Sequence, residues 1–485
     1  MTTPGSWRNP EPRGPYHLLI VGAGPAGLLA ALAAVGRGAK VALVERSLLG
    51  GICLNKGCIP SKTMIRASRL YKEMRDAERV GGRVPAGMAV DFPRVMERVR
   101  HVRARLSERE SAGRLTEIGV DVYFGEARFT GPDSVTVEGR VLRFEKALIA
   151  TGAAPMRPPI PGLEEAAYLT YENVFDLTEC PKRLLVIGGG PVGCELAQAF
   201  ARLGSRVTIV QDEPMFLVNE ERDAAQLLSD ALAEDGIEIH LDTQTTSVRL
   251  EGKDKVADLD SNGTKCTVAV DEILVGVGTV PNVEGLGLEA AGVTYDRKHG
   301  IAVDDFLRTS NPRIFAAGDV CGETKFPHIE TAAGRIVVAN ALFRGRQRVS
   351  AEIIPWCTFT DPEIAHVGMY VNEARRKGIP VMTFTVLMHE VDRAITDGEE
   401  DGFVKVHVRQ GTGKILGATV VASHAGDLVN EISLAMSAGL DLRALARVNQ
   451  PYPTQSQAIR MAAGAYMATR RSPFRKWLTK KWLSS

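Results

Sequence analysis

The chain has 485 residues, 45% of them hydrophobic and 24% charged, which is the composition of a globular protein of about three domains. The formal net charge of +1 provides no overall basic field, so we expect no nucleic-acid partner. No apolar run reaches the roughly 18 residues needed to span a membrane, and the seven cysteines are too sparse for a disulfide scaffold. Residues 1–15 lack the apolar core of a signal peptide, so we expect a disordered tail there and a cytoplasmic protein.

The first predicted element is a buried parallel strand at residues 16–24 that runs into a glycine-rich turn. An Ala- and Leu-rich helix follows, and a second strand at residues 40–44 ends in Glu45. The turn has the spacing GxGxxG, formed by Gly22, Gly24 and Gly27. Such glycines let the backbone approach a pyrophosphate, and the acid accepts from a ribose hydroxyl. A tight packing turn is the alternative, but the strand, the helix and the acid together favour a dinucleotide site.

Two cysteines, Cys53 and Cys58, lie in the stretch from Gly50 to Lys62, which also contains several glycines. Four residues separate the two cysteines. Pro60 is well placed in the first turn of a helix, whose positive N-terminal end favours thiolate over thiol. A zinc half-site would need two more Cys or His ligands at short spacing, and none lie near in the sequence. In a reducing cytoplasm a persistent disulfide is more often catalytic than structural, so this stretch predicts a redox pair.

Residues 62–119 have the pattern of helices. Dense charges between residues 94 and 114 surround apolar residues at three- and four-residue spacing. The basic residues there could form a nucleic-acid face, but the interleaved acids favour a solvated helix face. Short strands are predicted at residues 121–124, 134–137 and 147–150, and a proline-rich crossing near residue 155 indicates a domain boundary.

The strand–turn–helix pattern then repeats. A strand at residues 183–187 precedes a second GxGxxG, formed by Gly188, Gly190 and Gly193, and a strand at residues 206–210 ends at Gln211. Two dinucleotide folds in one chain imply two nucleotides, and the natural pair is a flavin with a nicotinamide. Gln211 can hydrogen-bond a ribose hydroxyl without adding charge, and acids rather than cations follow it, so we expect NADH in preference to NADPH.

The rest of the chain predicts a return to the first fold and then a third domain. Residues 236–278 alternate strands with polar turns, and a strand at 314–320 carries Asp319, an acceptor for a ribityl hydroxyl. From about residue 351, strand-like runs precede helices at 426–438 and 455–468. The predicted divisions are a flavin-binding domain at 16–155 and 283–350, a nicotinamide-binding domain at 156–282, and a third domain at 351–470.

Over roughly residues 16–470 these features resemble the flavoprotein disulfide reductases, which include dihydrolipoamide dehydrogenase, glutathione reductase and mercuric reductase. The resemblance rests on Cys-x4-Cys ending in Pro-Ser-Lys, the two fingerprints, Ala-Thr-Gly at 150–152 and Ala-Gly-Asp at 317–319, all in the family's order. It implies an α/β fold with two Rossmann-like dinucleotide-binding domains and a C-terminal α+β dimerisation domain. It also implies tightly bound FAD, NADH or NADPH as co-substrate, and a homodimer.

The resemblance implies a role for each matching residue. Cys53 is the interchange thiol that meets the substrate, and Cys58 is the flavin-side thiol. Lys62 lies near flavin N5 with Glu195 as its carboxylate partner, the alternatives being an exposed helix lysine and a structural carboxylate. The implied FAD-binding residues are Gly22, Gly24, Gly27, Glu45, Gly51, Thr151, Gly152 and Asp319. Those implied for the nicotinamide nucleotide are Gly188, Gly190, Gly193, Gln211 and Gly278.

The main departure from the family lies near the C-terminal end. Tyr452, which we count among the candidate catalytic residues, stands where lipoamide- and glutathione-type members carry an acid/base His. Gln457 stands where they carry the Glu that orients this His. A phenol titrates near pH ~10 and cannot shuttle protons near neutrality as imidazole does. A second departure is Thr279 after Gly278, where the family usually has Arg.

Mercuric reductase-like members also carry a Tyr in this region, and a soft metal ion needs thiolates more than it needs a base. We expect the metal-delivery parts of true mercuric reductases, the N-terminal metal-binding domain and the C-terminal cysteine pair, to be missing, since the last cysteine of the sequence is Cys357. The sequence therefore resembles the mercuric reductase-like branch without these parts, and it predicts no separate metal site.

The predicted function is that of an FAD-dependent oxidoreductase. Electrons pass from NAD(P)H through FAD and the Cys53–Cys58 disulfide to a small acceptor, such as a soft metal ion like Hg(II), a quinone or a small disulfide. One alternative is an NAD(P)H:acceptor diaphorase, quinone reductase or transhydrogenase whose disulfide is idle. Another is a membrane-associated flavin-binding redox sensor. Its basic amphipathic tail at 471–485 could lie on the inner face of an anionic membrane or pack on protein.

Overall fold

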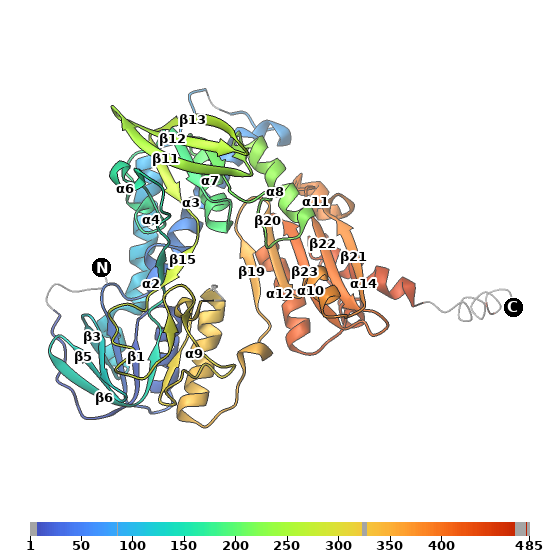
Figure 1. Cartoon of the computed structure of the whole chain (residues 1–485). Coiled ribbons are helices and arrows are strands. Elements are labelled where there is room, and N and C mark those ends of the chain that lie inside the picture. Colours follow the sequence, from blue (N-terminus) through green and yellow to red (C-terminus); the bar gives the residue numbers. More distant parts are fainter. Residues whose placement is uncertain (1–6, 85, 323–326, 471–481, 483–485) are drawn as a thin grey trace. The chain divides into compact units, whose positions relative to one another are not determined.

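The computed structural model describes residues 7–84, 86–322 and 327–470 together with Trp482, except for the side chains of residues 327–331. The chain divides into two compact units, which are described separately. The first unit comprises residues 1–214 and 236–352, and the second comprises residues 215–235 and 353–485 (Figure 1). The predicted tail at 471–485, apart from Trp482, lies outside the described residues.

The first unit contains a seven-stranded sheet whose centre is parallel. Its path is β3-β2-β1-β6-β5-β4, with β18 paired to β6. The parallel strands are β1 (Tyr16–Val21), β2 (Val41–Glu45), β3 (Val120–Phe124), β6 (Arg140–Ile149) and β18 (Ile314–Ala316). β4 (Arg128–Gly131) and β5 (Ser134–Val137) extend it in antiparallel fashion. The first Rossmann-like fold expected from the sequence is therefore confirmed.

Both faces of this sheet are covered, which explains the apolar run at residues 18–21 of β1. Leu18 and Ile20 pack in one hydrophobic cluster with α1 (Pro25–Val35) and α9 (Pro327–Leu342). Leu19 and Val21 point the other way, into a cluster with β4, β5 and β6. Successive residues of a strand alternate between faces, so a strand buried on both sides reads as continuously hydrophobic.

A second, four-stranded parallel sheet follows the order β10-β9-β8-β14. Its strands are β8 (Arg183–Ile187), β9 (Arg206–Val210), β10 (Glu238–His240) and β14 (Glu272–Val275), and α7 (Pro191–Arg202) connects β8 to β9. An antiparallel meander of β11 (Thr243–Glu251), β12 (Asp254–Ser261) and β13 (Thr264–Val270) precedes β14. The chain crosses between the two sheets on paired strands, β7 (Ala153–Pro155) and β15 (Thr279–Pro281). The second predicted dinucleotide fold is thus present.

Two segments of the first unit differ from the sequence prediction. The helical pattern over 62–119 is broken into α3 (Cys58–Arg75), η1 (Ala77–Val80), α4 (Phe92–Ser107), η2 (Glu108–Glu110) and α5 (Ala112–Glu117). The break follows Gly81, which has a φ of +83°, a backbone conformation that ends a helix. The predicted loose tail is held at Asn9, whose side chain exchanges two hydrogen bonds of 2.7 and 2.8 Å with the backbone of Phe124.

The second unit is built on an antiparallel sheet of order β19-β20-β23-β22-β21. These strands are β19 (Pro355–Thr358), β20 (Glu363–Gly368), β21 (Val381–Leu387), β22 (Phe403–Arg409) and β23 (Ile415–Ala422). The helices of this unit are α8 (Arg222–Glu234), α10 (Val371–Arg376), α11 (Asp392–Asp397), α12 (Ala425–Ser437), α13 (Leu442–Leu445) and α14 (Gln457–Thr469). The predicted helices at 426–438 and 455–468 are confirmed. Among the described residues, no helix is both long and apolar enough to cross a membrane.

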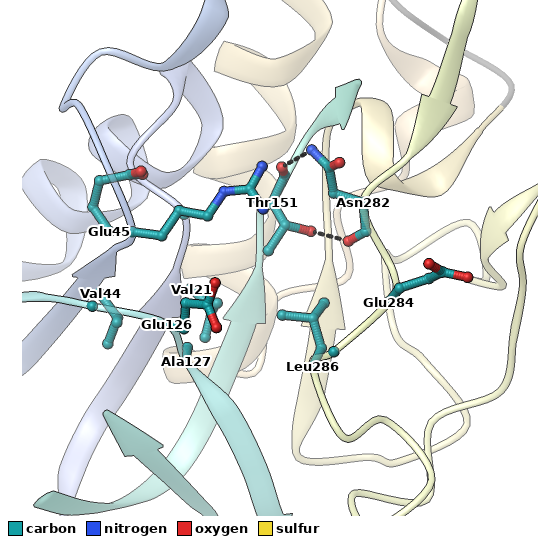
Figure 2. A pocket seen from close by; sticks show the side chains of 13 residues that line it. Val21, Val44, Glu45, Glu126, Ala127, Thr151, Asn282, Glu284 and Leu286 are labelled. Carbon is teal, nitrogen blue, oxygen red and sulfur yellow. Dashed lines mark hydrogen bonds between the residues drawn. The ribbon is translucent and has the colours of Figure 1, made fainter. Parts of the chain in front are cut away.

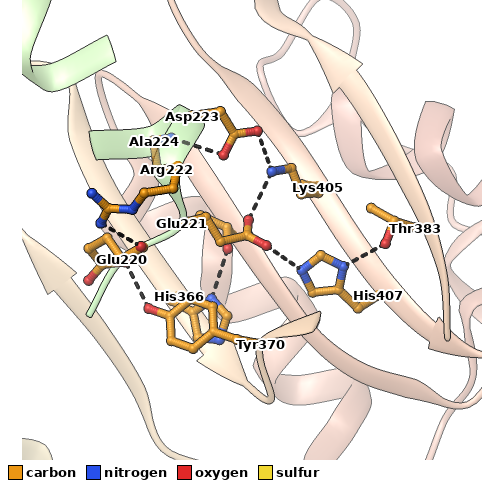
Figure 3. A network of polar contacts seen from close by, with 11 residues as sticks. Glu220, Glu221, Arg222, Asp223, Ala224, His366, Tyr370, Thr383, Lys405 and His407 are labelled. Atoms are coloured by element: carbon orange, nitrogen blue, oxygen red, sulfur yellow. Dashed lines mark hydrogen bonds and ion pairs between the residues drawn. The ribbon is translucent and has the colours of Figure 1, made fainter. Parts of the chain in front are cut away.

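A buried network of charges fastens the chain before α8 to the sheet of the second unit (Figure 3). Glu221 lies 3.0 Å from Lys405 Nζ and 3.2 Å from His407 Nε2, both on β22. Burial raises the pKa of Glu221, but the hydrogen bond from His407 and the pairing with Lys405 outweigh it and lower the pKa to about 2. The neighbouring Glu220 accepts hydrogen bonds from Trp356 Nε1 and the Tyr370 hydroxyl at 3.0 and 2.8 Å.

His366 on β20 is fully buried beside this network and is held in its neutral form. Its Nδ1 lies 2.8 Å from Thr419 Oγ1, and its Nε2 lies 3.2 Å from Gly368 O. Its ring stacks on that of Tyr370, with the two ring centroids 3.7 Å apart. Burial lowers the pKa of His366 to about 3, against the hydrogen bond to Gly368 O, which raises it. The imidazole therefore carries no charge in the folded protein at any pH well above 3.

This neutral histidine predicts that the chain loses stability in mild acid. The unfolded chain protonates His366 near its ordinary pKa of ~6.5, whereas the folded chain does not, so stability falls as the pH drops below that value. Between pH 7 and pH 5 the loss from this one group is about 2 kcal/mol. Urea unfolding followed by tryptophan fluorescence at pH 7, 6 and 5 measures it. His366→Gln should flatten the pH dependence by this amount, and an equally steep dependence in the variant would contradict the assignment.

Candidate active site

The first glycine turn is shaped by close backbone packing. Gly22 has a φ of +104°, and a Cβ placed on it would lie 2.2 Å from Ala150 O on the neighbouring strand. A Cβ on Gly27 would lie 1.9 Å from Gly22 O. The middle glycine differs, because a Cβ on Gly24 would meet nothing closer than 4.0 Å. The two outer glycines are therefore required by the fold, and the middle one leaves space in front of the turn.

Glu45 braces this turn from the end of β2. One of its carboxylate oxygens accepts from Ala23 N and the other from Ser47 N, both at 2.8 Å. Helix α1 begins directly after the turn, and no side chain caps its N-terminus, where Gly24 is the N-cap. The free N–H groups and the positive end of the helix dipole suit a pyrophosphate.

A pocket opens at the carboxyl ends of β1 and β2 (Figure 2). Its lining consists of Val21, Gly22, Val44, Glu45, Arg46, Gly125, Glu126, Ala127, Thr151, Asn282, Glu284, Gly285 and Leu286. Parallel α/β sheets bind ligands at this end of their strands. With the space at Gly24 and the uncapped helix, these residues fit the adenosine and pyrophosphate of FAD. Gly125, Glu126 and Glu284 were not singled out from the sequence, because no motif marks them.

Asn282 joins the two chain crossings beside this pocket. Thr151 Oγ1 donates to Asn282 O at 2.8 Å, and Asn282 Nδ2 donates to Thr151 O at 2.9 Å (Figure 2). Asn282 N also donates to Gly152 O at 2.9 Å. On the return strand, Gly278 has a φ of +109°, and its carbonyl accepts from Met156 N at 2.9 Å. The backbone pairing is therefore intact next to Thr279, where the family usually has Arg.

The cysteine stretch forms two helices. Cys53 lies in α2 (Gly51–Asn55), and Cys58 is the first residue of α3. Asn55 Nδ2 donates to Leu49 O and Gly51 O, both at 2.9 Å, and fixes the stretch between the cysteines. A Cβ on Gly51 would lie 2.7 Å from Gly24 Cα, so the stretch passes against the first glycine turn. The expected placement of a thiol at a helix N-terminus is confirmed.

The surroundings of Cys58 lower its pKa and so favour the thiolate over the thiol. The hydrogen bond from Cys53 is the largest influence and lowers the pKa of Cys58, and the charge of Lys62 lowers it further. Burial and the charge of Glu195 act in the opposite direction, and the net shift is downward. Lys62 Nζ lies 2.7 Å from Glu195 Oε2, with Glu195 only 8% exposed. Four of the predicted catalytic residues are thus in one place.

The second glycine turn repeats the design of the first. A Cβ on Gly188 would lie 2.7 Å from Gly276 O, and one on Gly193 would lie 2.0 Å from Gly188 O. A Cβ on Gly190 would meet nothing within 4 Å. Gln211 Oε1 accepts from Gly189 N at 2.6 Å, as Glu45 does in the first fold. These residues fit a second dinucleotide, and α7, whose N-terminus no side chain caps, also carries Glu195.

Asp319 and Tyr452 are the two remaining predicted site residues. Asp319 begins η4 (Asp319–Cys321) directly after β18. Burial is the largest influence that raises the pKa of Tyr171, followed by the charge of Glu172 and then by the charge of Asp319. Tyr452 belongs to the second unit and is 73% exposed. Its hydroxyl donates to Asp392 Oδ2 at 2.9 Å. Asp392 could not be predicted as a partner of Tyr452, because no local sequence pattern links residues 60 positions apart.

The structure contains two dinucleotide folds, with two cysteines, a lysine and a carboxylate gathered between their glycine turns. This arrangement is that of an oxidoreductase that uses a flavin and a pyridine nucleotide. Comparison with known proteins agrees. The family model for pyridine nucleotide-disulphide oxidoreductases matches residues 16–335, and the model for the family's dimerisation domain matches residues 354–463. The chain belongs to the pyridine nucleotide-disulphide oxidoreductases, enzymes that use FAD and NAD(P)H. The dimerisation domain supports a homodimer.

Individual relatives cover nearly the whole chain. A mercuric reductase from Staphylococcus aureus is 35% identical over 93% of this chain and 82% of its own length. A Cu(II) complex of the HOCl-induced flavoprotein disulfide reductase RclA from Escherichia coli superposes with a TM-score of 0.82, at 29% identity, over 92% of this chain and 98% of its own. LpdA from Mycobacterium tuberculosis gives a TM-score of 0.85 at 30% identity, over 93% and 99% of the two chains.

Two variants distinguish a glycine that leaves space for a ligand from one that backbone packing requires. These are Gly190→Ala and Gly193→Ala. Gly193→Ala places a methyl group against Gly188 O and should destabilise the protein by about 1–3 kcal/mol. Gly190→Ala should fold normally and retain flavin, because its methyl group meets no protein atom, yet raise the KM for the nicotinamide nucleotide. Thermal midpoints and steady-state kinetics measure both effects. Equal midpoints for the two variants would contradict this division of roles.

The thiolate character of Cys58 should depend more on Cys53 than on Lys62. Cys53→Ala removes the larger influence, so the pKa of Cys58 should rise further in this variant than in Lys62→Met. The measurement is the pH dependence of Cys58 alkylation by iodoacetamide in the reduced protein, followed by mass spectrometry. Cys266→Ser, at an exposed position on β13, is the control and should change nothing. A larger rise in Lys62→Met would reverse the assignment.

Proposed function

We propose that this enzyme passes electrons from NAD(P)H, through FAD and the Cys53–Cys58 pair, to a small acceptor, and that the preferred acceptor is a soft metal ion such as Hg(II). The observation that carries the proposal is the hydrogen bond from Cys53 to Cys58 beside the Lys62–Glu195 pair. Two thiols in contact, one of them biased to thiolate, form a centre that can close to a disulfide and open again.

The chemistry that bound FAD supplies is two-electron transfer between a nicotinamide and a disulfide. The chain's own residues supply the rest. One NAD(P)H and one proton convert the Cys53–Cys58 disulfide to two thiols. Reduction of a divalent cation to the neutral metal then restores the disulfide and releases two protons. Lys62 stabilises negative charge next to Cys58, and Glu195 holds the Lys62 ammonium in place at 2.7 Å.

The absence of an imidazole at position 452 favours a metal ion over a disulfide. Exchange with an external disulfide produces a leaving thiolate that a neutral-pH acid must protonate, and Tyr452 titrates too high to do so. A soft cation needs thiolate ligands, and two adjacent cysteines offer them. The relatives support this choice, since one is a mercuric reductase and another was solved as a Cu(II) complex.

We also propose NADH as the better electron donor. Gln211 uses Oε1 to hold the Gly189 amide, so its outer group is the neutral Nε2, which adds no positive charge for a 2′-phosphate. The next two residues, Asp212 and Glu213, are exposed acids that repel a phosphate.

Steady-state turnover with each nicotinamide and with Hg(II), quinones and small disulfides as acceptors tests the proposal. NADH with Hg(II), presented as a thiol complex, should give the highest kcat/KM. Cys53→Ser and Cys58→Ser should each lower that value by a hundredfold or more, because each removes half of the redox pair. On two-electron reduction the wild type should show the long-wavelength absorption of a thiolate next to oxidised flavin, and Cys58→Ser should not.

The other outcomes of this screen identify other functions. Full turnover of Cys53→Ser with the best acceptor would mean that the disulfide is idle and that the protein is a diaphorase or quinone reductase. Slow turnover with every acceptor would favour a redox sensor. Either result overturns the proposed electron path, and Cys266→Ser again serves as the matched control because this exposed cysteine lies outside the site.

A further inference from the structure

The chain before β1 is fastened to the outer edge of the seven-stranded sheet. β3 stands at one end of the strand order, with β2 as its described neighbour. Gly125 N, just past β3, donates to Glu45 O on β2 at 3.0 Å. Successive residues of a strand direct their N–H and C=O groups to opposite sides, so those of Phe124, the last residue of β3, face the outer edge.

Residues 7–13, which we call the strap, satisfy this edge at Phe124. Asn9 Oδ1 accepts from Phe124 N at 2.8 Å, and Asn9 Nδ2 donates to Phe124 O at 2.7 Å. A carboxamide has both an acceptor and a donor, so this one side chain replaces a neighbouring strand at Phe124. The ring of Trp7 meets that of Phe124 edge to face, with the centroids 5.8 Å apart and the planes at 84°. The strap therefore fixes both the backbone and the side chain of Phe124.

The strap also has a contact that does not involve Phe124. Glu11 Oε1 lies 3.1 Å from Arg140 on β6, and the Glu11 side chain is 83% exposed. Exposed ion pairs of this kind contribute little to stability. Glu11→Gln therefore removes a strap contact without disturbing Phe124, and this variant is the matched control for Asn9.

Phe124 leads directly into one wall of the pocket that fits the adenosine and pyrophosphate of FAD. Residues 125–127 form this wall (Figure 2). Beyond it, Phe129 N donates to Leu286 O at 2.7 Å, and Leu286 lines the same pocket. The wall thus spans two fixed points, Phe124 and Phe129. Since affinity depends on how firmly a lining is held before the ligand binds, the contacts of Phe124 affect the retention of FAD.

We propose that Asn9 and Trp7 are positioning residues for the cofactor, which fix Phe124, hold the wall at 125–127 in place and thereby slow the release of FAD. Without them the wall is free to move and has to be ordered each time FAD binds, which lowers the affinity. The inference goes beyond the proposed function, because it concerns retention of the cofactor and is the same for every electron acceptor.

The first test measures the release of FAD from the holoenzyme. The protein is diluted, and the rise in flavin fluorescence reports the FAD that leaves it. Asn9→Ala should release FAD about tenfold faster than the wild type, because it loses two hydrogen bonds of ordinary net strength. Trp7→Ala should also release FAD faster, whereas Trp7→Phe, which retains a ring against Phe124, should stay closer to the wild type. Glu11→Gln should match the wild type. Equal release from Asn9→Ala and the wild type would overturn the proposal.

The second test locates the effect within the holoenzyme. Hydrogen–deuterium exchange, read by mass spectrometry in peptides that contain residues 124–127, should be faster in Asn9→Ala than in the wild type and unchanged in Glu11→Gln. Peptides from the second glycine turn, residues 188–193, should exchange alike in all three proteins. Faster exchange at both places would assign the effect to a general loss of stability. Faster release of FAD with unchanged exchange at 124–127 would assign it to another route. Either result would overturn the positioning role.

Discussion

The contact between Lys62 and Glu195 links the two halves of the chemistry. Lys62 lies on α3, the helix that begins at Cys58, and Glu195 lies on α7, the helix that begins at the second glycine turn. Their 2.7 Å ion pair ties the thiol end of the site to the nicotinamide end. Glu195 is almost fully buried, and a buried carboxylate that loses an ion-pair partner costs free energy, so this pairing holds the two helices together. The pair is thus both a packing constraint and the source of the positive charge that Cys58 experiences.

The features that the sequence predicted are those that a short stretch encodes by itself. The two GxGxxG turns, the acid and the amide at the ends of β2 and β9, and the thiol at a helix N-terminus all follow from spacing and residue type. The bracing bonds from Glu45 to Ala23 and from Gln211 to Gly189 each join residues 22 positions apart. The break in the helical pattern after Gly81 was missed, because charged amphipathic segments on either side of it have the same periodicity.

Contacts between distant residues could not be predicted in this way. The bond from Tyr452 to Asp392, and the network that joins Glu220 and Glu221 to the sheet of the second unit, connect residues that no local pattern relates. From the sequence, Glu220 and Glu221 look like ordinary surface acids before a helix. Tertiary packing buries Glu220 and pairs Glu221 with Lys405 and His407, and these surroundings shift the pKa values of both acids.

The comparison of Glu45 with Gln211 separates two functions that usually coincide at the end of a Rossmann strand. In both folds one side-chain oxygen accepts from a backbone amide of the glycine turn, at 2.8 Å for Glu45 and 2.6 Å for Gln211. A carbonyl oxygen suffices for that bracing bond, so replacing the acid by an amide preserves the turn. What changes is the second group, which is an acceptor in Glu45 and a donor in Gln211. The fold therefore tolerates the amide, and the choice of nucleotide at the second site depends on the charges that surround the ribose.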